Sequence, residues 1–89
     1  MRTLIHERAY TDALKALGDI RRLDDALTGA EWALGTNPEA YDIVKGTRDI
    51  RLLKTDALGG LPPMRLWFRI DEDGSHVHLE YIEPVEQGA

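Results

Sequence analysis

Residues 64–70 read MRLWFRI and residues 77–82 read VHLEYI, and these two runs decide the fold. Apolar residues alternate with other residues in both runs, which is typical of strands with one buried face. The expected inward residues are Met64, Leu66, Phe68 and Ile70 in the first run and Val77, Leu79 and Tyr81 in the second. Between the runs lies the acidic segment Asp71–Gly74, whose glycine can adopt a positive φ. The sequence therefore predicts an antiparallel β-hairpin.

A four-residue loop at Asp71–Gly74 sets the predicted pairing of this hairpin. The inner pairs are then Phe68 with Val77, Leu66 with Leu79, and Met64 with Tyr81. The outer pairs are Arg69 with His76, Trp67 with His78, and Arg65 with Glu80. A loop one residue longer would place Glu80 in the core, and we reject it because burying an unpaired charge is costly.

Helical patterns precede the hairpin. A short strand is predicted at residues 2–6 and a helix at residues 9–17. From Ile20 to Leu34 apolar residues recur at steps of three and four, which predicts a second helix that ends near Gly35. The short break at Gly18-Asp19 predicts that the two helices form an antiparallel hairpin.

A further strand is predicted at residues 49–54, with Ile50 and Leu52 directed toward the core. The last strand is expected at Ser75–Ile82, Pro84 is expected to end it, and residues 85–89 are expected to be loose. No repeat or linker interrupts the chain, so one domain is expected over residues 1–89. The predicted class is α+β, with an N-terminal strand and a helical hairpin packed on a three-stranded antiparallel meander.

Composition excludes several classes of protein. The chain has 89 residues, of which 43% are hydrophobic and 30% charged, which is the balance of a small globular domain. It has no cysteine, so disulfides, thiolate metal sites and cysteine catalysis are excluded. No apolar run approaches the roughly 18 residues that a membrane helix needs. Because the N-terminus has no apolar signal segment either, a cytoplasmic location is expected.

Charge is unevenly distributed along the chain. The formal net charge is −5, which is unusual for a protein that binds nucleic acid. Residues 48–69 nevertheless contain five basic residues, namely Arg48, Arg51, Lys54, Arg65 and Arg69. Residues 70–89 contain no Lys or Arg and six acidic residues. A basic middle segment therefore lies within an acidic protein.

The outward face of the predicted meander concentrates the reactive side chains. It is expected to gather Arg51, Arg65, Trp67, Arg69, His76, His78 and Glu80. Arginine binds phosphate through paired hydrogen bonds, tryptophan stacks on bases, and histidine or glutamate can act as a general base. These residue types suit RNA chemistry. An alternative interpretation is structural, with Arg65 and Glu80 as a cross-strand ion pair and Trp67 packed on a histidine.

A metal site is not predicted. His76, His78 and Glu80 share one face of a strand, but three collinear positions converge poorly on a single ion. The Gly59-Gly60 pair is not followed by Lys and Ser or Thr, so it is interpreted as a loop and not as a phosphate-binding motif. No cofactor is expected.

The order of these elements resembles the RelE/ParE toxin superfamily. The residues that carry the resemblance are IRLLK at 50–54, MRLWFRID at 64–71 and VHLEYI at 77–82. The segments LIHERA at 4–9 and LKALG at 14–18 are similar to the family as well. The resemblance covers nearly the whole chain.

The resemblance implies a small toxin that is held by an antitoxin protein. RelE-like members cut mRNA at the ribosome, whereas ParE-like members poison DNA gyrase. By position, Arg65 matches the arginine that contacts the scissile phosphate, and Arg51 and Lys54 match the basic second strand. Together with the residue chemistry above, this gives Arg65, Glu80 and His78 as candidate catalytic residues and Arg51, Lys54, Trp67 and Arg69 as candidate RNA-binding residues.

A second class of function stays open. Residues 83–87 contain no Arg, Lys, His or Tyr, which active RelE-like members carry in this region, and the net charge is −5. These features favour a non-catalytic acidic inhibitor of phage or mobile-element origin, which would block a basic, nucleic-acid-handling enzyme. A homodimer through Trp32 or through an exposed strand edge is a further candidate assembly.

Overall fold

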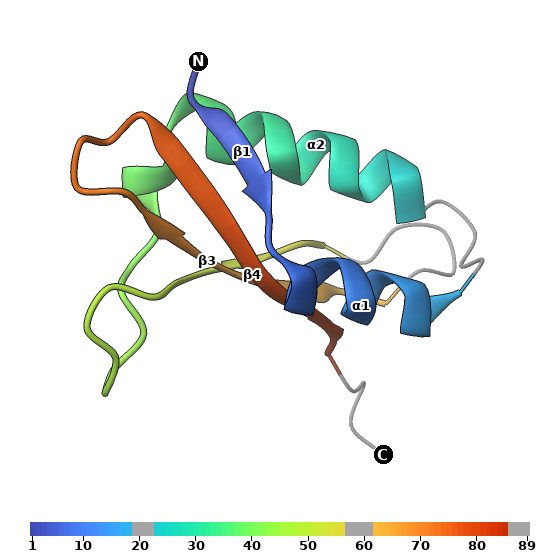
Figure 1. The fold of residues 1–89 in the computed structure, drawn as a ribbon. Coiled ribbons are helices and arrows are strands. Elements are labelled where there is room, and N and C mark those ends of the chain that lie inside the picture. The colour runs from blue at the N-terminus through green and yellow to red at the C-terminus, as the bar shows by residue number, and fades with distance from the viewer. Residues whose placement is uncertain (19–22, 57–61, 86–89) are drawn as a thin grey trace.

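The computed structural model describes residues 1–18, 23–56 and 62–85 as two helices, one 3₁₀ turn and a mixed sheet (Figure 1). In chain order the elements are β1 (Thr3–His6), α1 (Arg8–Leu17), α2 (Leu23–Thr36), η1 (Pro38–Ala40), β2 (Arg51–Lys54), β3 (Met64–Ile70) and β4 (His76–Pro84). The strand order in the sheet is β1-β4-β3-β2. β1 runs parallel to β4, and the other neighbours are antiparallel. The predicted α+β architecture is confirmed.

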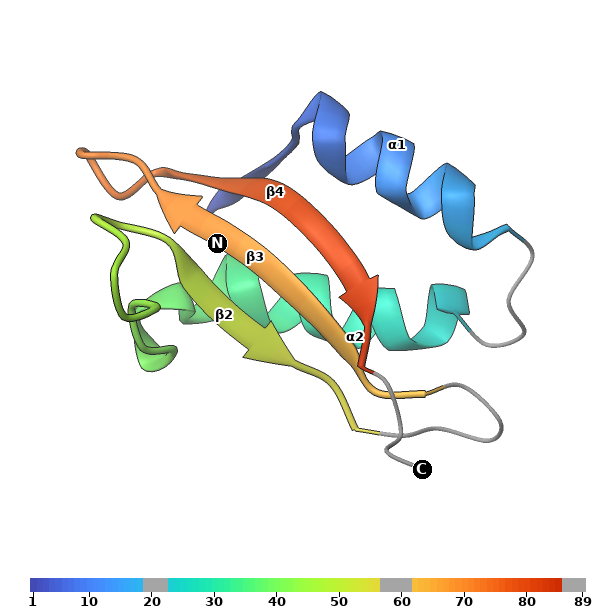
Figure 2. The ribbon, with the colours of Figure 1, turned by 90° about the horizontal axis from the view of Figure 1, so that it is seen from below.

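Both helices follow from apolar residues at helical spacing. In α2 the buried residues include Leu23, Leu27, Ala30 and Leu34, which form one stripe. α1 buries Tyr10 and ends at Gly18, whose positive φ of 68° suits glycine at a helix terminus. The two helices run in opposite directions (Figures 1 and 2), as predicted, although the start expected at Ile20 lies outside the described residues.

One face of the sheet packs against the helices and forms the core. The buried sheet residues are Leu53, Met64, Leu66, Phe68, Val77, Leu79 and Ile82. In Figure 2 the sheet lies in front of α2, and the face turned to the viewer carries no helix of the described chain. We call this uncovered side the outer face.

The hairpin pairs two residues further along β4 than predicted. The Asp71 amide donates a hydrogen bond to the His76 carbonyl oxygen (3.0 Å), so the loop comprises residues 72–75 and not 71–74. Phe68 therefore pairs with Leu79, and Arg69 pairs with His78. Because side chains alternate with a period of two, a shift of two residues keeps every inward residue inward. The alternation alone could not distinguish the two registers.

A β-bulge between the Phe68–Leu79 and Trp67–Tyr81 pairs reverses the expected orientation of Tyr81. Tyr81 is 45% exposed and Ile82 is 2% exposed, so the prediction that Tyr81 points inward is wrong. Strict alternation after Leu79 would place both Tyr81 and Glu83 on the inner face. The extra residue, Glu80, reverses the alternation after it. Glu83 then faces outward, which avoids the cost of burying its carboxylate, and Ile82 faces the core.

The orientation predicted for β2 is also wrong. Leu53, at 4% exposure, faces the core, so its neighbour Leu52 faces outward. Arg51 pairs with Phe68 and lies on the inner side, where its Nη1 donates a hydrogen bond to the Tyr41 carbonyl oxygen (2.6 Å). Arg51 therefore does not join Arg65 on the outer face.

Arg2 connects three parts of the chain that are distant in sequence. Its Nε–H donates to the carbonyl oxygen of Gly74 in the β3–β4 turn (2.7 Å). Its Nη2 forms an ion pair with Glu39 of η1 (2.6 Å), and its Nη1 lies 3.4 Å from the Thr36 carbonyl oxygen. One guanidinium thus joins the N-terminus, the end of α2 and the hairpin turn.

The Tyr10 side chain carries a buried hydroxyl without a hydrogen-bond partner among the described residues. Burial, with a smaller effect from the charge of Glu31, raises the pKa of the Tyr10 phenol. A buried polar group without a partner costs about 1–3 kcal/mol. We therefore expect Tyr10→Phe to raise the free energy of unfolding by about 1 kcal/mol in urea titrations. A loss of stability in this variant would contradict the orphaned hydroxyl.

Candidate functional site

Most of the predicted site residues lie on the outer face, but their cross-strand partners differ from those predicted. Arg65 pairs with Glu83, and Trp67 pairs with Tyr81. Lys54 lies beside Arg65 on the neighbouring strand β2. The outer face therefore carries Lys54, Arg65, Trp67, Arg69, His78 and Glu80 from the predicted set, with Arg51 excluded and Tyr81 added.

The three predicted catalytic residues do not form one compact group. Glu80 Oε1 accepts a hydrogen bond from Arg69 Nε (2.7 Å), and His78 contacts two other carboxylates. Arg65 lies four residues from Arg69 along β3, roughly 13 Å at 3.3 Å per residue. The outer face thus has two parts, a cationic and aromatic end at Arg65 and a histidine and carboxylate end at His78.

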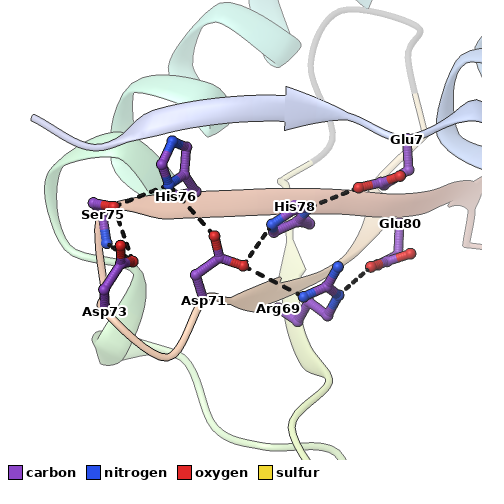
Figure 3. A network of polar contacts seen from close by, with 8 residues as sticks. All are labelled: Glu7, Arg69, Asp71, Asp73, Ser75, His76, His78 and Glu80. Carbon is purple, nitrogen blue, oxygen red and sulfur yellow. Dashed lines mark hydrogen bonds and ion pairs between the residues drawn. The ribbon is translucent and has the colours of Figure 1, made fainter.

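His78 is held between two carboxylates (Figure 3). Its Nδ1 lies 2.6 Å from Glu7 Oε2, and its Nε2 lies 2.6 Å from Asp71 Oδ1. The side chain is only 12% exposed. Short contacts of both ring nitrogens with carboxylates are the geometry of an imidazolium that donates two charge-assisted hydrogen bonds. With both nitrogens occupied, His78 does not fit the role of a general base.

The same contacts determine how His78 titrates. The hydrogen bond with Glu7 has the largest effect and raises the pKa of His78. Partial burial and the charge of Arg69 act in the opposite direction, and Asp71 raises the pKa further. The net effect favours the charged imidazolium.

Arg69 extends the contacts of His78 toward the bulge. Its Nη1 lies 3.5 Å from Asp71 Oδ1, the oxygen that also contacts His78, and its Nε binds Glu80. A polar network of Glu7, His78, Asp71, Arg69 and Glu80 therefore crosses the outer face (Figure 3). Sequence reasoning missed Glu7 and Asp71 in this network, because no local pattern links Glu7 to a residue 71 positions away.

The turn between β3 and β4 brings Asp71, Asp73 and His76 together, with potential ligand atoms within 4.8 Å of one another. These groups are already engaged. Asp73 Oδ1 accepts hydrogen bonds from the amide and the hydroxyl of Ser75, which lower the pKa of Asp73. Asp71 contacts His78 and Arg69. We therefore interpret the cluster as turn and network contacts and not as a metal centre.

A groove of about 330 Å³ lies between α2 and β2, away from the predicted site residues other than Lys54. Its lining includes the small residues Ala26, Gly29, Ala30 and Ala33. The lining also holds Asp25, Tyr41, Lys54, Thr55 and Asp56, but Lys54 is the one predicted site residue that reaches it, so the candidate site is placed on the outer face, where the other predicted residues gather. Neither α1 nor α2, the helices of the described residues, has the length and apolar character of a membrane-spanning segment.

Comparison with known proteins supports the fold. No protein-family model and no curated protein sequence matches the chain. A chain of the E. coli RelBE toxin–antitoxin complex is 17% identical, with a TM-score of 0.72 over 98% of this chain and 100% of that chain. A chain of the Mycobacterium tuberculosis RelBE2 toxin–antitoxin complex is 19% identical, with a TM-score of 0.69 over 94% and 98% of the two chains. The conserved hypothetical protein HP0892 of Helicobacter pylori is 17% identical, with a TM-score of 0.53 over 94% of each chain.

These similarities extend over nearly the full length of each matched chain. They agree with the resemblance to RelE-like proteins that the order of helices and strands indicated. The chain therefore has a RelE-like fold.

Proposed function

We propose that the protein is a RelE-like toxin that inhibits growth by cutting mRNA at the ribosome and that an antitoxin protein restrains it in the cytoplasm. The observation that carries the proposal is the helix-free outer face, where Trp67 and Tyr81 lie opposite each other beside Arg65 and Lys54. Aromatic rings beside cations on a sheet are typical of surfaces that bind single-stranded nucleic acid. The RelE-like fold supports the same class of function.

Arg65 and Lys54 are the cations best placed to meet a phosphate. The Arg65–Glu83 ion pair is long (3.4 Å), and its two side chains are 41% and 36% exposed. Exposed pairs of this kind contribute under about 1 kcal/mol, so a phosphate can displace Glu83 at little cost. Lys54 is exposed and has no ion-pair partner in the described part of the chain. Arg69 is held by two carboxylates and is expected to contribute less to binding.

Cleavage of RNA requires a base for the attacking ribose hydroxyl and a cation for the charge that develops on the phosphate. In this proposal Arg65 supplies the cation. Glu80 stays the candidate base, and because its Oε1 binds Arg69 toward the His78 end of the outer face, the proposal requires that bound RNA draws this carboxylate toward Arg65. His78 is assigned to the network and not to proton transfer, since both of its ring nitrogens are engaged.

The test is inducible expression in a bacterium without any companion gene, with growth and the 5′ ends of transcripts as readouts. The wild-type protein is expected to arrest growth and cut transcripts, and Arg65→Ala and Trp67→Ala are each expected to relieve both effects. Arg8→Ala is the matched control, because Arg8 is 94% exposed on α1 and lies outside the outer face. Arrest that persists in Arg65→Ala would contradict the assignment of the site.

One observation favours a second candidate function. Arg65 and Arg69 both have carboxylate partners, and the chain carries a net charge of −5. A non-catalytic acidic protein that blocks a basic, nucleic-acid-handling enzyme would fit this charge balance. Unimpaired growth with a high yield of wild-type protein would overturn the toxin proposal. A basic partner recovered in pull-downs with the wild-type protein, and lost with the double variant Glu72→Gln and Asp73→Asn, would support the alternative.

A further inference from the structure

His78 joins three segments of the chain that are remote in sequence. Glu7 follows β1 and precedes the first residue of α1, Asp71 follows β3, and His78 is the third residue of β4. β1 is an edge strand whose sheet partner is β4. Beside the main-chain hydrogen bond from Glu7 N–H to the Leu79 carbonyl oxygen (3.1 Å), the Glu7–His78 contact fastens the junction of β1 and α1 to β4.

The two contacts of His78 require two N–H donors. An imidazolium has two donors, whereas a neutral imidazole has one donor and one lone pair. Loss of the proton therefore leaves one carboxylate facing a lone pair in a side chain that is only 12% exposed. Both contacts cannot be kept after deprotonation.

The groups that face His78 decide the direction of the effect. Glu7 and Asp71 favour the charged ring, and Arg69 opposes it. On β4 itself, His76 and Glu80 lie two residues before and after His78, and Glu80 forms an ion pair with Arg69. From β1 the residue paired with His78 is Ile5, which carries no charge. Two carboxylates in direct contact thus outweigh one guanidinium that contacts His78 only through Asp71.

We propose that His78 is a proton-linked latch that holds β1 and the first turn of α1 against β4 and releases them when it loses its proton. The latch is closed when both carboxylate contacts of His78 are formed, and it is fully closed below the pKa of an unpaired histidine, about 6.5. It opens, by loss of one of these contacts, as the pH rises through the pKa of His78 in the folded protein. This inference does not depend on the proposed function.

The test is amide hydrogen exchange of the full chain between pH 5.5 and pH 8.5, corrected for intrinsic exchange rates. Protection of the Thr3 and Glu7 amides is expected to fall with pH, tenfold for each unit by which the pKa of His78 is higher in the closed state than in the open state. The Thr55 amide is the internal control, because it donates to the Met64 carbonyl oxygen between β2 and β3, at the far edge of the sheet. Its protection is expected to stay constant.

Variants separate His78 from the other two histidines. Glu7→Gln is expected to reduce the pH dependence, and His78→Gln is expected to abolish it. His76→Gln and His6→Gln are the matched controls and should retain it. The His6 control is essential, because His6 lies in β1 and its Nε2 is 3.0 Å from Glu31 Oε1. A pH dependence that disappears in His6→Gln would assign the effect to that pair and overturn the latch.

The wild-type protein provides a test that no folding defect can obscure. An NMR titration of the His78 ring should give a midpoint above 6.5, and a midpoint below that value would overturn the proposal. An equal loss of protection at Thr3, Glu7 and Thr55 would also overturn it, because the effect would then be global unfolding and not release of β1.

Discussion

An Ile82→Ala variant is expected to lose about 2–5 kcal/mol of unfolding free energy, whereas Tyr81→Ala should lose less than about 1 kcal/mol. The contrast follows from the bulge, which buries Ile82 at 2% exposure and leaves Tyr81 45% exposed. Removing the Ile82 side chain leaves a cavity beneath β4. Removing Tyr81 takes away only a half-exposed side chain at the position opposite Trp67 on the outer face.

Urea titrations with a constant m-value would measure both variants. A domain of this size has a small stability margin, which the loss in Ile82→Ala can exceed. Ile82→Val is the milder variant, with an expected loss of about 0.5–1.5 kcal/mol. A larger loss for Tyr81→Ala than for Ile82→Ala would show that Tyr81 is the buried residue and that the bulge is absent.

Arg2→Ala is expected to lower the free energy of unfolding by about 2 kcal/mol, a large effect for a residue next to the N-terminus. The variant removes the 2.7 Å hydrogen bond to Gly74 and the 2.6 Å ion pair with Glu39, and it leaves the Gly74 carbonyl without that partner. The Arg2 side chain is 27% exposed, so solvent screens part of the effect, and the expected loss stays at the lower end for charged hydrogen bonds.

Arg8→Ala serves as the control for Arg2→Ala in thermal or urea unfolding. Arg8 is 94% exposed, and its Nε lies 3.7 Å from Asp12, so its removal should change stability by no more than about 0.5 kcal/mol. Arg2→Lys is expected to lose most of the stabilisation, since one ammonium group cannot span Gly74 and Glu39 as the guanidinium fork does. Equal losses for Arg2→Ala and Arg8→Ala would contradict the role assigned to Arg2.

The sequence allowed the elements to be predicted, but not the way in which they pair. Residues 64–70 alternate cleanly and form β3 over the predicted range. The register predicted for β4 was wrong because a shift of two residues preserves the apolar face. The bulge was not predicted because alternation contains no signal for an inserted residue. In β2 the adjacent Leu52 and Leu53 made the inward residue ambiguous, and the choice of Leu52 misplaced Arg51.

For the candidate site too, the face on which a residue lies was more predictable than the partner that it contacts. Arg65, Trp67 and Lys54 share the outer face because alternation fixed their side of the strands. Their partners were not predictable, since each partner depends on register. The contact of His78 with Glu7 joins the residue after β1 to β4, which are the first and last strands along the chain, and no local pattern in the sequence predicts a contact across that separation.

The parallel pairing of β1 with β4 has a consequence for synthesis of the protein. Thr3 pairs with His76 and His6 pairs with Leu79, so the first strand to leave the ribosome has its sheet partner more than 70 residues later in the chain. Contacts of this sequence separation close late and slow folding. While a nascent chain lacks residues 76–84, the sheet has neither its central strand β4 nor an attachment for β1. The outer face and its network therefore cannot assemble until β4 has emerged, and any activity that depends on them begins only then.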